Sequence, residues 1–113
     1  MANGSAFRVA LSRAQKILLS ALETDPESIE LLTCLGAVYL DEGDPGRART
    51  FLQKAVSLGS RDSNTYFNLG LAITQQRPHR EVDQLLGYKF FHKEKRLRGS
   101  SATWRAYFDF HGQ

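Results

Sequence analysis

The feature that most constrains this chain is a spacing of 34 residues at which similar residues return. The dipeptide Leu35-Gly36 is followed by Leu69-Gly70 at that spacing. Large apolar residues on either side return with it. The matched positions are Leu32, Leu35, Gly36 and Tyr39 in one copy and Tyr66, Leu69, Gly70 and Ile73 in the other. Recurrence at a fixed period predicts a repeat architecture, in which similar units stack on one another.

A second set of residues recurs at the same spacing. The matched positions are Ala14, Leu18, Ala21 and Pro26, followed 34 residues later by Ala48, Leu52, Ala55 and Ser60. Residues three, four and seven apart lie on one face of an α-helix, so each set predicts a helix with one buried face. Small residues such as Gly36 and Ala48 suit positions where two helices approach closely. The Gly- and Pro-containing stretch 42–46 predicts the turn between two such helices.

Composition sets limits on these expectations. The chain has 113 residues, enough for one domain over 1–113, and a single cysteine, Cys34, which cannot form an internal disulfide. No apolar run approaches the roughly 20 residues of a membrane span, and the first residues lack a secretory signal, which predicts a cytoplasmic protein. The net charge is +3, and residues 77–113 hold eight Lys and Arg against four Asp and Glu. The basic character therefore lies in the C-terminal third.

The two recurring sets resemble the tetratricopeptide repeat family, whose 34-residue unit consists of two helices, A and B. The family's pattern of Leu-Gly, Tyr and spaced Ala is present in 29–62, where only the final Pro is replaced, by Ser60. The resemblance implies an all-α fold of antiparallel helix-turn-helix pairs stacked as a short right-handed superhelix. On this pattern, 5–24 is helix B of an incomplete repeat, 29–62 is a full repeat, 63–96 is a degenerate repeat, and 97–113 is a basic, aromatic capping segment.

Both flanks depart from the repeat pattern. In 63–96, Val82 and Leu86 take the expected helix-B positions, but Lys89 stands where a small residue is required and Gly87 should weaken the helix. Aromatic residues then crowd into 102–110, at Trp104, Tyr107, Phe108 and Phe110. This cluster predicts a short capping helix over the last pair. The alternative is a disordered aromatic tail that meets a partner.

The first helix, 5–24, lacks its own helix A and is therefore expected to expose apolar surface. Three interpretations remain open. The helix caps the array, the chain is a fragment or isoform of a longer repeat protein, or the surface is covered by a partner or by a second copy in a homodimer.

The function that the resemblance implies is a non-catalytic scaffold, adaptor or co-chaperone-like module that binds a peptide or protein partner in a concave groove. Phe67 and Leu71 lie off the buried stripe of their helix, so they are candidate anchors, although they could instead pack against the capping helix. A clamp for a terminal carboxylate is rejected, because Thr33 and Ala37 stand where Lys and Asn are required. The groove positions that the pattern implies are Glu30, Thr33, Ala37, Leu40, Asp41, Asn64, Phe67, Asn68, Leu71, Thr74 and Gln75.

Nucleic-acid or acidic-surface binding is the alternative function. It rests on a basic cluster near Phe90, Phe91 and Trp104, a combination suited to phosphate contacts and base stacking. The favoured explanation of the cluster is a solvated helix end, where Lys and Arg meet the negative pole of the helix dipole. The cluster comprises Lys89, Lys93, Lys95, Arg96 and Arg98. An enzyme, a metal site and a cofactor are not expected, because the three histidines are dispersed and no phosphate-binding or nucleophile motif is present.

Overall fold

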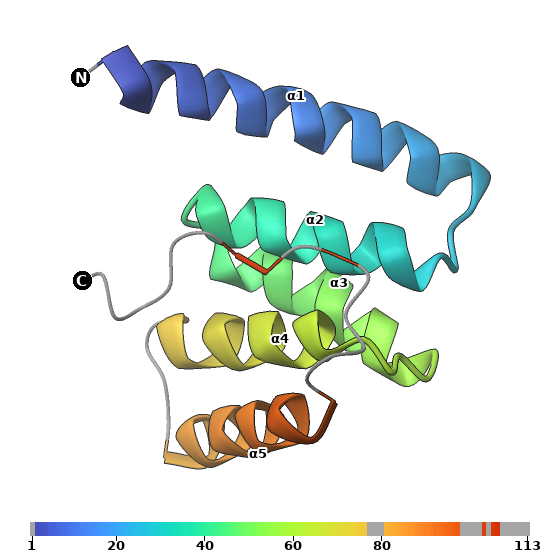
Figure 1. The fold of residues 1–113 in the computed structure, drawn as a ribbon, viewed down its shortest axis with the longest axis vertical. Coiled ribbons are helices and arrows are strands. Elements are labelled where there is room, and N and C mark those ends of the chain that lie inside the picture. The colour runs from blue at the N-terminus through green and yellow to red at the C-terminus, as the bar shows by residue number, and fades with distance from the viewer. Residues whose placement is uncertain (1, 77–80, 98–102, 104, 107–113) are drawn as a thin grey trace.

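The computed structural model describes residues 2–76, 81–97, 103, 105 and 106; within it, residues 2–5, 81–86 and 88 are described by their backbone alone. The described residues contain five α-helices and no strand, which confirms the all-α class. Each helix packs on the next one along the chain, and α2 also contacts α4 (Figure 1). The helices are α1 (Ala2–Thr24), α2 (Ile29–Asp41), α3 (Pro45–Ser57), α4 (Ser63–Gln75) and α5 (Glu81–Leu97).

The α2–α3 pair is held by a close approach between Gly36 and Leu52, both fully buried. A Cβ added to Gly36 would lie 2.3 Å from the Leu52 Cγ, so the absence of a side chain is what lets the two helices meet here. Ala48 and Ala55 are also completely buried, as the small-residue pattern predicted. Tyr39 stacks on Phe51 with ring centroids 5.6 Å apart.

The α4–α5 pair repeats this arrangement with different residues. A Cβ on Gly70 would lie 2.8 Å from the Phe91 ring, and a Cβ on Gly87 would lie 2.5 Å from the Thr74 Cγ2. Gly87, expected only to weaken its helix, is therefore a contact point between helices. Phe91 meets Gly70 as Leu52 meets Gly36, but it lies 39 residues after Leu52 instead of 34.

This shift corrects the predicted register of the second pair. Lys89, assigned to a buried small-residue position, is exposed. The side chains of Val82 and Leu86 lie outside the described residues. The inward stripe of α5 includes Gly87, Phe91 and Glu94. A longer connection between α4 and α5 than between α2 and α3 accounts for part of the shift.

Local sequence rules set most helix ends. Asp44 caps α3 by accepting from the Arg47 N–H at 3.1 Å, and Pro45 occupies the first turn. Asp62 caps α4, with its Oδ1 2.9 Å from the Asn64 N–H. The cap of α2 is Ser28, which follows a turn over residues 25–28 closed by the Ser28 N–H and the Asp25 carbonyl. The first helix begins at Ala2, three residues before the start of the predicted range 5–24.

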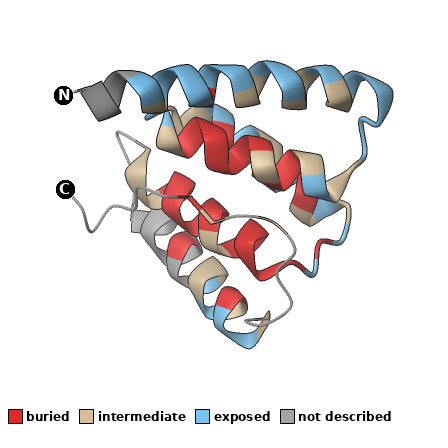
Figure 2. Ribbon diagram, turned by 45° about the horizontal axis from the view of Figure 1, so that its top comes forward, coloured by how far each residue is buried: buried red, intermediate tan, exposed pale blue. Residues whose placement is uncertain are grey.

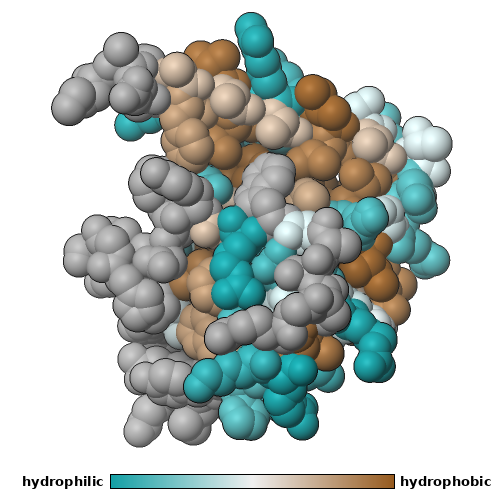
Figure 3. All heavy atoms as spheres, in the orientation of Figure 1, coloured by the Kyte–Doolittle hydropathy of each residue, from teal (hydrophilic) through white to brown (hydrophobic). Residues whose placement is uncertain are grey.

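The first helix, α1, is half-covered. Leu11 is buried, and Leu18 and Leu22 pack against the core, while Val9 and Ile17 are 52% and 68% exposed. Figure 2 shows exposed residues along the outer side of α1 and buried residues in α2 and α4. In the face drawn in Figure 3, apolar residues gather in the upper part, where α1 lies. The predicted exposure of apolar surface on this helix is confirmed.

The segment after α5 turns back over the helices. In Figure 1 the short red pieces that include Thr103, Arg105 and Ala106 lie across the helices, and their hydrogen bonds reach Asn64 and Asn68 of α4. Thr103, Arg105 and Ala106 have no helical hydrogen-bond pattern, so the predicted capping helix over 102–110 is wrong at these residues. Their polar groups bond to side chains of the helices instead. The aromatic residues Trp104, Tyr107, Phe108 and Phe110 lie outside the described residues.

Candidate functional site: a surface on α4 occupied by the C-terminal segment

The predicted groove positions differ widely in exposure. Six of them are buried: Thr33, Ala37, Leu40, Asn64, Asn68 and Leu71. Four are half-buried: Asp41, Phe67, Thr74 and Gln75. Glu30 is exposed. Three of the predicted positions, Asn64, Phe67 and Asn68, come together around one feature, the segment Thr103–Ala106.

Two asparagines of α4 hold the main chain of this segment. The Asn64 side-chain amide donates to the Thr103 carbonyl. The Ala106 N–H donates to the Asn68 Oδ1 at 2.9 Å. Asn64 and Asn68 lie one helical turn apart, so their amides meet main-chain groups three residues apart in the segment. Main-chain groups are present in any polypeptide, and this pair of contacts therefore recognises a chain and not one residue type.

Arg105 makes the charged side-chain contacts between this segment and the helices. Its Nε donates to the Asn64 Oδ1 at 3.0 Å, and its Nη1 lies 3.2 Å from the Glu94 Oε1. The guanidinium also lies over the Phe67 ring, 4.0 Å from the centroid. Glu94 is only 3% exposed, so the carboxylate of this ion pair is withdrawn from water, whereas the Arg105 side chain is 35% exposed. A hydrogen bond, an ion pair and a cation–π contact together define an arginine-binding subsite.

Thr103 joins the segment to a buried polar network. Its hydroxyl donates to the Asp62 Oδ2 at 2.6 Å, while the Asp62 N–H donates to the Ser60 Oγ at 3.2 Å. The Ser60 and Thr65 hydroxyls are 2.8 Å apart, and Thr65 lies 2.6 Å from the Thr33 hydroxyl of α2. Groups in such a network support one another, since each is buried and depends on its neighbours for hydrogen bonds.

Phe67 and Leu71 have different surroundings. Phe67 is half-buried, meets Phe91 edge-on with centroids 5.8 Å apart, and carries Arg105 on its ring. Leu71 is completely buried in the core. Phe67 therefore belongs to the segment-binding surface, whereas Leu71 packs inside the fold.

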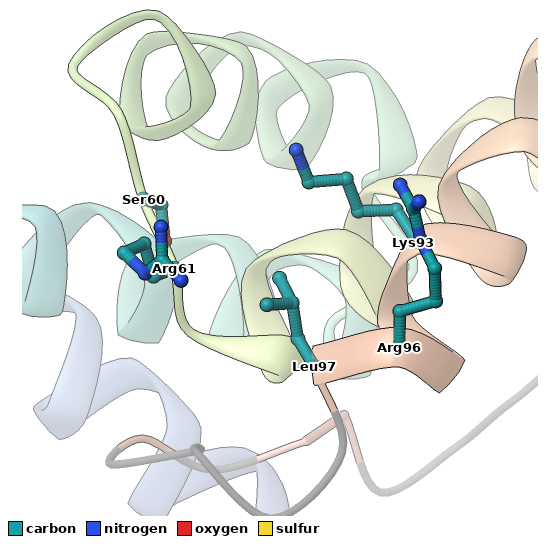
Figure 4. A pocket seen from close by; sticks show the side chains of 5 residues that line it. All are labelled: Ser60, Arg61, Lys93, Arg96 and Leu97. Atoms are coloured by element: carbon teal, nitrogen blue, oxygen red, sulfur yellow. The ribbon is translucent and has the colours of Figure 1, made fainter.

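The basic cluster is divided between a pocket and open solvent. A pocket of about 260 Å³ is lined by Ser60, Arg61, Lys93, Arg96 and Leu97. Figure 4 shows Ser60 and Arg61, from the connection before α4, on one side, with Lys93, Arg96 and Leu97 of α5 on the other. Lys89 and Lys95 are exposed elsewhere on α5, and Arg98 lies outside the described residues.

The aromatic residues beside this cluster face inward. Phe90 stacks on Tyr66 with centroids 6.2 Å apart, and Phe91 packs on Phe67 and against Gly70. Neither ring is fully exposed. Stacking of nucleic-acid bases on these two rings would require them to leave their packing partners.

Tyr66 lies between the polar network and the pocket. Its hydroxyl donates to the Ser60 carbonyl at 2.5 Å, and the Lys93 Nζ lies 5.1 Å from its ring centroid. Burial raises the pKa of the Tyr66 phenol, with a smaller opposing effect from Arg61. Burial also raises the pKa of Glu42 at the α2–α3 turn, where Asp44 adds to the shift and Arg47 opposes it. Neither shift lies in the segment-binding surface.

Within the described ranges, no group of three or more His, Cys, Asp or Glu is arranged to hold a metal ion. His92 is exposed, and His79 and His111 lie outside those ranges. No helix among the described residues is both long and apolar enough to cross a membrane.

Several residues of the site were not foreseen from the sequence: Asp62, Glu94, Thr103, Arg105 and Ala106. Glu94 could have been found from the sequence only after the five-residue shift of α5 was known, because it then falls on the inward stripe that Gly87 and Phe91 define.

Comparison with known proteins finds neither a protein-family model that matches this chain nor a similar curated protein.

Proposed function

We propose that this chain is a non-catalytic protein-interaction module that binds an extended peptide or partner segment on α4. The observation that carries the proposal is the pair of asparagines, Asn64 and Asn68, bonded to main-chain groups of residues 103–106. A surface that already holds one stretch of polypeptide by its backbone has the chemistry to hold another. The 34-residue interval between the first residues of α2 and α4 supports the tetratricopeptide-like architecture proposed for the module.

The binding mode follows from the two kinds of contact. Asn64 and Asn68 fix the position of the ligand backbone, and the neighbouring acidic and aromatic side chains select its residues. Glu94 and Phe67 favour a cation, while Asp62 favours a hydroxyl donor. Scaffold, adaptor and co-chaperone roles all use such a surface.

The test is affinity for peptides selected from a random display library against the full chain. The double variant Phe67→Ala/Asn68→Ala should weaken binding at least tenfold, about 1.4 kcal/mol, because it removes a backbone contact and an aromatic contact. Circular dichroism should show unchanged helical content. Gln53→Ala, at an exposed position on α3, is the matched control and should bind as the original chain does. Unchanged affinity in the double variant would place the binding site elsewhere.

A second candidate function is binding of an anionic group at the pocket between Arg61, Lys93 and Arg96. The observation that favours it is the approach of Arg61, from before α4, to two cations of α5 (Figure 4). Charge reversal at Arg61, Lys93 and Arg96 should abolish binding of a single-stranded oligonucleotide at this pocket, and added salt should weaken it steeply. Salt-insensitive binding, or none in a gel-shift assay, would exclude this function.

A further inference from the structure

Residues 103–106 make the contacts expected of a bound ligand. Its described residues, Thr103, Arg105 and Ala106, have no helical hydrogen-bond pattern. The main chain is bonded at Thr103 and at Ala106, and the side chains of Thr103 and Arg105 enter polar subsites. Ala106 is 7% exposed and packs against the hydrophobic core. We propose that this segment is an intramolecular ligand that closes the α4 surface, and that the partners displacing it are extended protein segments carrying a hydroxyl residue, an arginine and a small residue at the same spacing.

This inference rests on the proposed function and names the ligand class for that site. The spacing comes from the contacts: a hydroxyl residue for Asp62, an arginine two positions later for Glu94 and Phe67, and then a small residue. Glu94 is buried and acidic, so a ligand without a cation would leave a carboxylate of the site without the ion pair that Arg105 provides. Acidic segments are therefore excluded by the same group that selects arginine.

The tether makes the intramolecular ligand an effective competitor. Only five residues, 98–102, separate the end of α5 at Leu97 from Thr103. A short tether holds its ligand at an effective concentration of about millimolar. A free segment with the same contacts, supplied at micromolar concentration, is therefore outcompeted until the tethered one is weakened. The arrangement keeps the surface closed to weak ligands and admits strong or abundant ones.

The experiment measures binding of a free copy of the segment to the full chain. The probe is a fluorescently labelled, end-blocked peptide with the sequence of residues 100–108, titrated with the original chain and with Thr103→Val/Arg105→Ala. The double variant removes the tethered side-chain contacts and should bind the probe at least tenfold more tightly, about 1.4 kcal/mol. The matched control is Arg13→Ala, an exposed arginine on α1, which should leave the affinity unchanged.

Two further measurements locate the binding. Adding Asn64→Ala/Asn68→Ala to the double variant should abolish probe binding, because the backbone contacts are lost. A probe with glutamate in place of its arginine should not bind the double variant, because it would meet Glu94. Amide hydrogen exchange at Ala106 reports the intramolecular contact directly and should accelerate in Thr103→Val/Arg105→Ala while circular dichroism stays constant.

The outcomes separate this inference from the function on which it rests. Equal probe affinity for the original chain and the double variant would overturn the closed state. Failure of the probe to bind, while library-selected peptides still bind through Asn68 and Phe67, would overturn the ligand class and leave the proposed function standing. Failure of both would overturn both. A dimeric original chain that becomes monomeric in the double variant would place the segment of a second copy on the surface and overturn the intramolecular arrangement.

Discussion

The α2–α3 and α4–α5 pairs share one kind of close contact between their helices but differ in what covers the first helix of each pair. In each pair a glycine of the first helix admits a large side chain of the second, Leu52 at Gly36 and Phe91 at Gly70. Residues earlier in the same two helices differ. At the 34-residue spacing, Cys34 of α2 corresponds to Asn68 of α4, and Glu30 corresponds to Asn64. The first pair is covered by helices, α1 on one side and α4 on the other. In the second pair, the amides of Asn64 and Asn68 are bonded to a segment that is not helical.

Under the proposed function, this difference would be a binding surface acquired by one of two similarly packed helix pairs. The glycine contact sets the helix packing, so the neighbouring positions are free to vary without loss of the fold. In α4 those positions carry groups that bond to a polypeptide backbone. The contrast between the pairs can therefore be tested by changing the shared contact and by copying residues from the first pair into the second.

The largest effect is expected from the shared contact. Gly36→Ala should lower the free energy of unfolding by about 2 kcal/mol, because overpacking against the branched carbon of Leu52 outweighs the better helix propensity of alanine. Gly70→Ala should lower the free energy of unfolding by about 1 kcal/mol. The effect is smaller because its Cβ would lie 2.8 Å from the Phe91 ring, whereas a Cβ on Gly36 would lie 2.3 Å from Leu52. Guanidinium denaturation measures both.

The control for these variants is Gln53→Ala, at an exposed position, which should change stability by less than about 0.5 kcal/mol. Leu52→Val shortens the side chain that meets position 36, so the double variant with Gly36→Ala should be more stable than the sum of the two single changes predicts. Strict additivity would contradict the close approach.

The second effect tests the binding surface by copying Cys34 into the corresponding position of α4. Asn68→Cys removes the acceptor of the Ala106 N–H and should cost about 1.5 kcal/mol, because a buried donor loses its partner. Amide exchange at Ala106 should accelerate at the same time. Cys34→Ala, the matched change in α2, should leave that exchange rate as it was. Slow exchange at Ala106 in Asn68→Cys would show that the amide has another acceptor.

How much of the fold and of the candidate site could be predicted depends on the sequence separation of the residues that determine each feature. The close approach at Gly36 and the turn within 42–46 follow from a fixed period and from local rules, and both were predicted. The register of α5 was not, because a fixed period cannot reveal a shift of five residues after α4. The contacts of Asn64 and Asn68 join residues 38 and 39 positions apart and use main-chain groups of the segment, which leave no mark in the sequence.

The surface itself was only partly predictable for the same reason. Asn68 and Phe67 were predicted as groove positions from the repeat pattern, and in the structure they contact a segment of the same chain. Glu94 was not predicted because the 34-residue period gave the wrong register for α5. The polar contacts of Thr103 and Arg105 could not be predicted because the sequence does not show which residues they bond to. Local patterns thus predict the scaffold, whereas the occupied surface depends on a long-range contact.

A third effect, about 1 kcal/mol, is expected from Tyr66→Phe, which removes the hydroxyl bonded to the Ser60 carbonyl and keeps the ring packing on Phe90. Burial raises the pKa of this phenol above its ordinary value of 10.0, so the folded chain favours the protonated form. The associated stability is complete below pH 10 and is lost as the pH rises through the folded-state pKa.

Thermal unfolding between pH 8 and pH 11 measures this difference. The original chain and Tyr66→Phe should differ by a constant amount below about pH 10 and converge above it. Tyr39→Phe, the matched change beside Phe51 in the first pair, retains Tyr66 and should keep the alkaline loss of stability. Parallel curves over the whole range would contradict the raised pKa.

The smallest effect on stability separates helix capping from segment binding. Ser28 caps α2 and lies 34 residues before Asp62, which caps α4 and also accepts the Thr103 hydroxyl. Asp62→Ser copies the α2 cap into α4. It should change the free energy of unfolding by less than about 1 kcal/mol, because serine is also a good N-cap residue. Serine lacks the second oxygen that Thr103 uses, so amide exchange at Ala106 should nevertheless accelerate. Asp62→Ala removes both roles and should cost about 1 kcal/mol more than Asp62→Ser. Equal costs for the two variants would mean that the carboxylate serves the segment and contributes nothing as a cap.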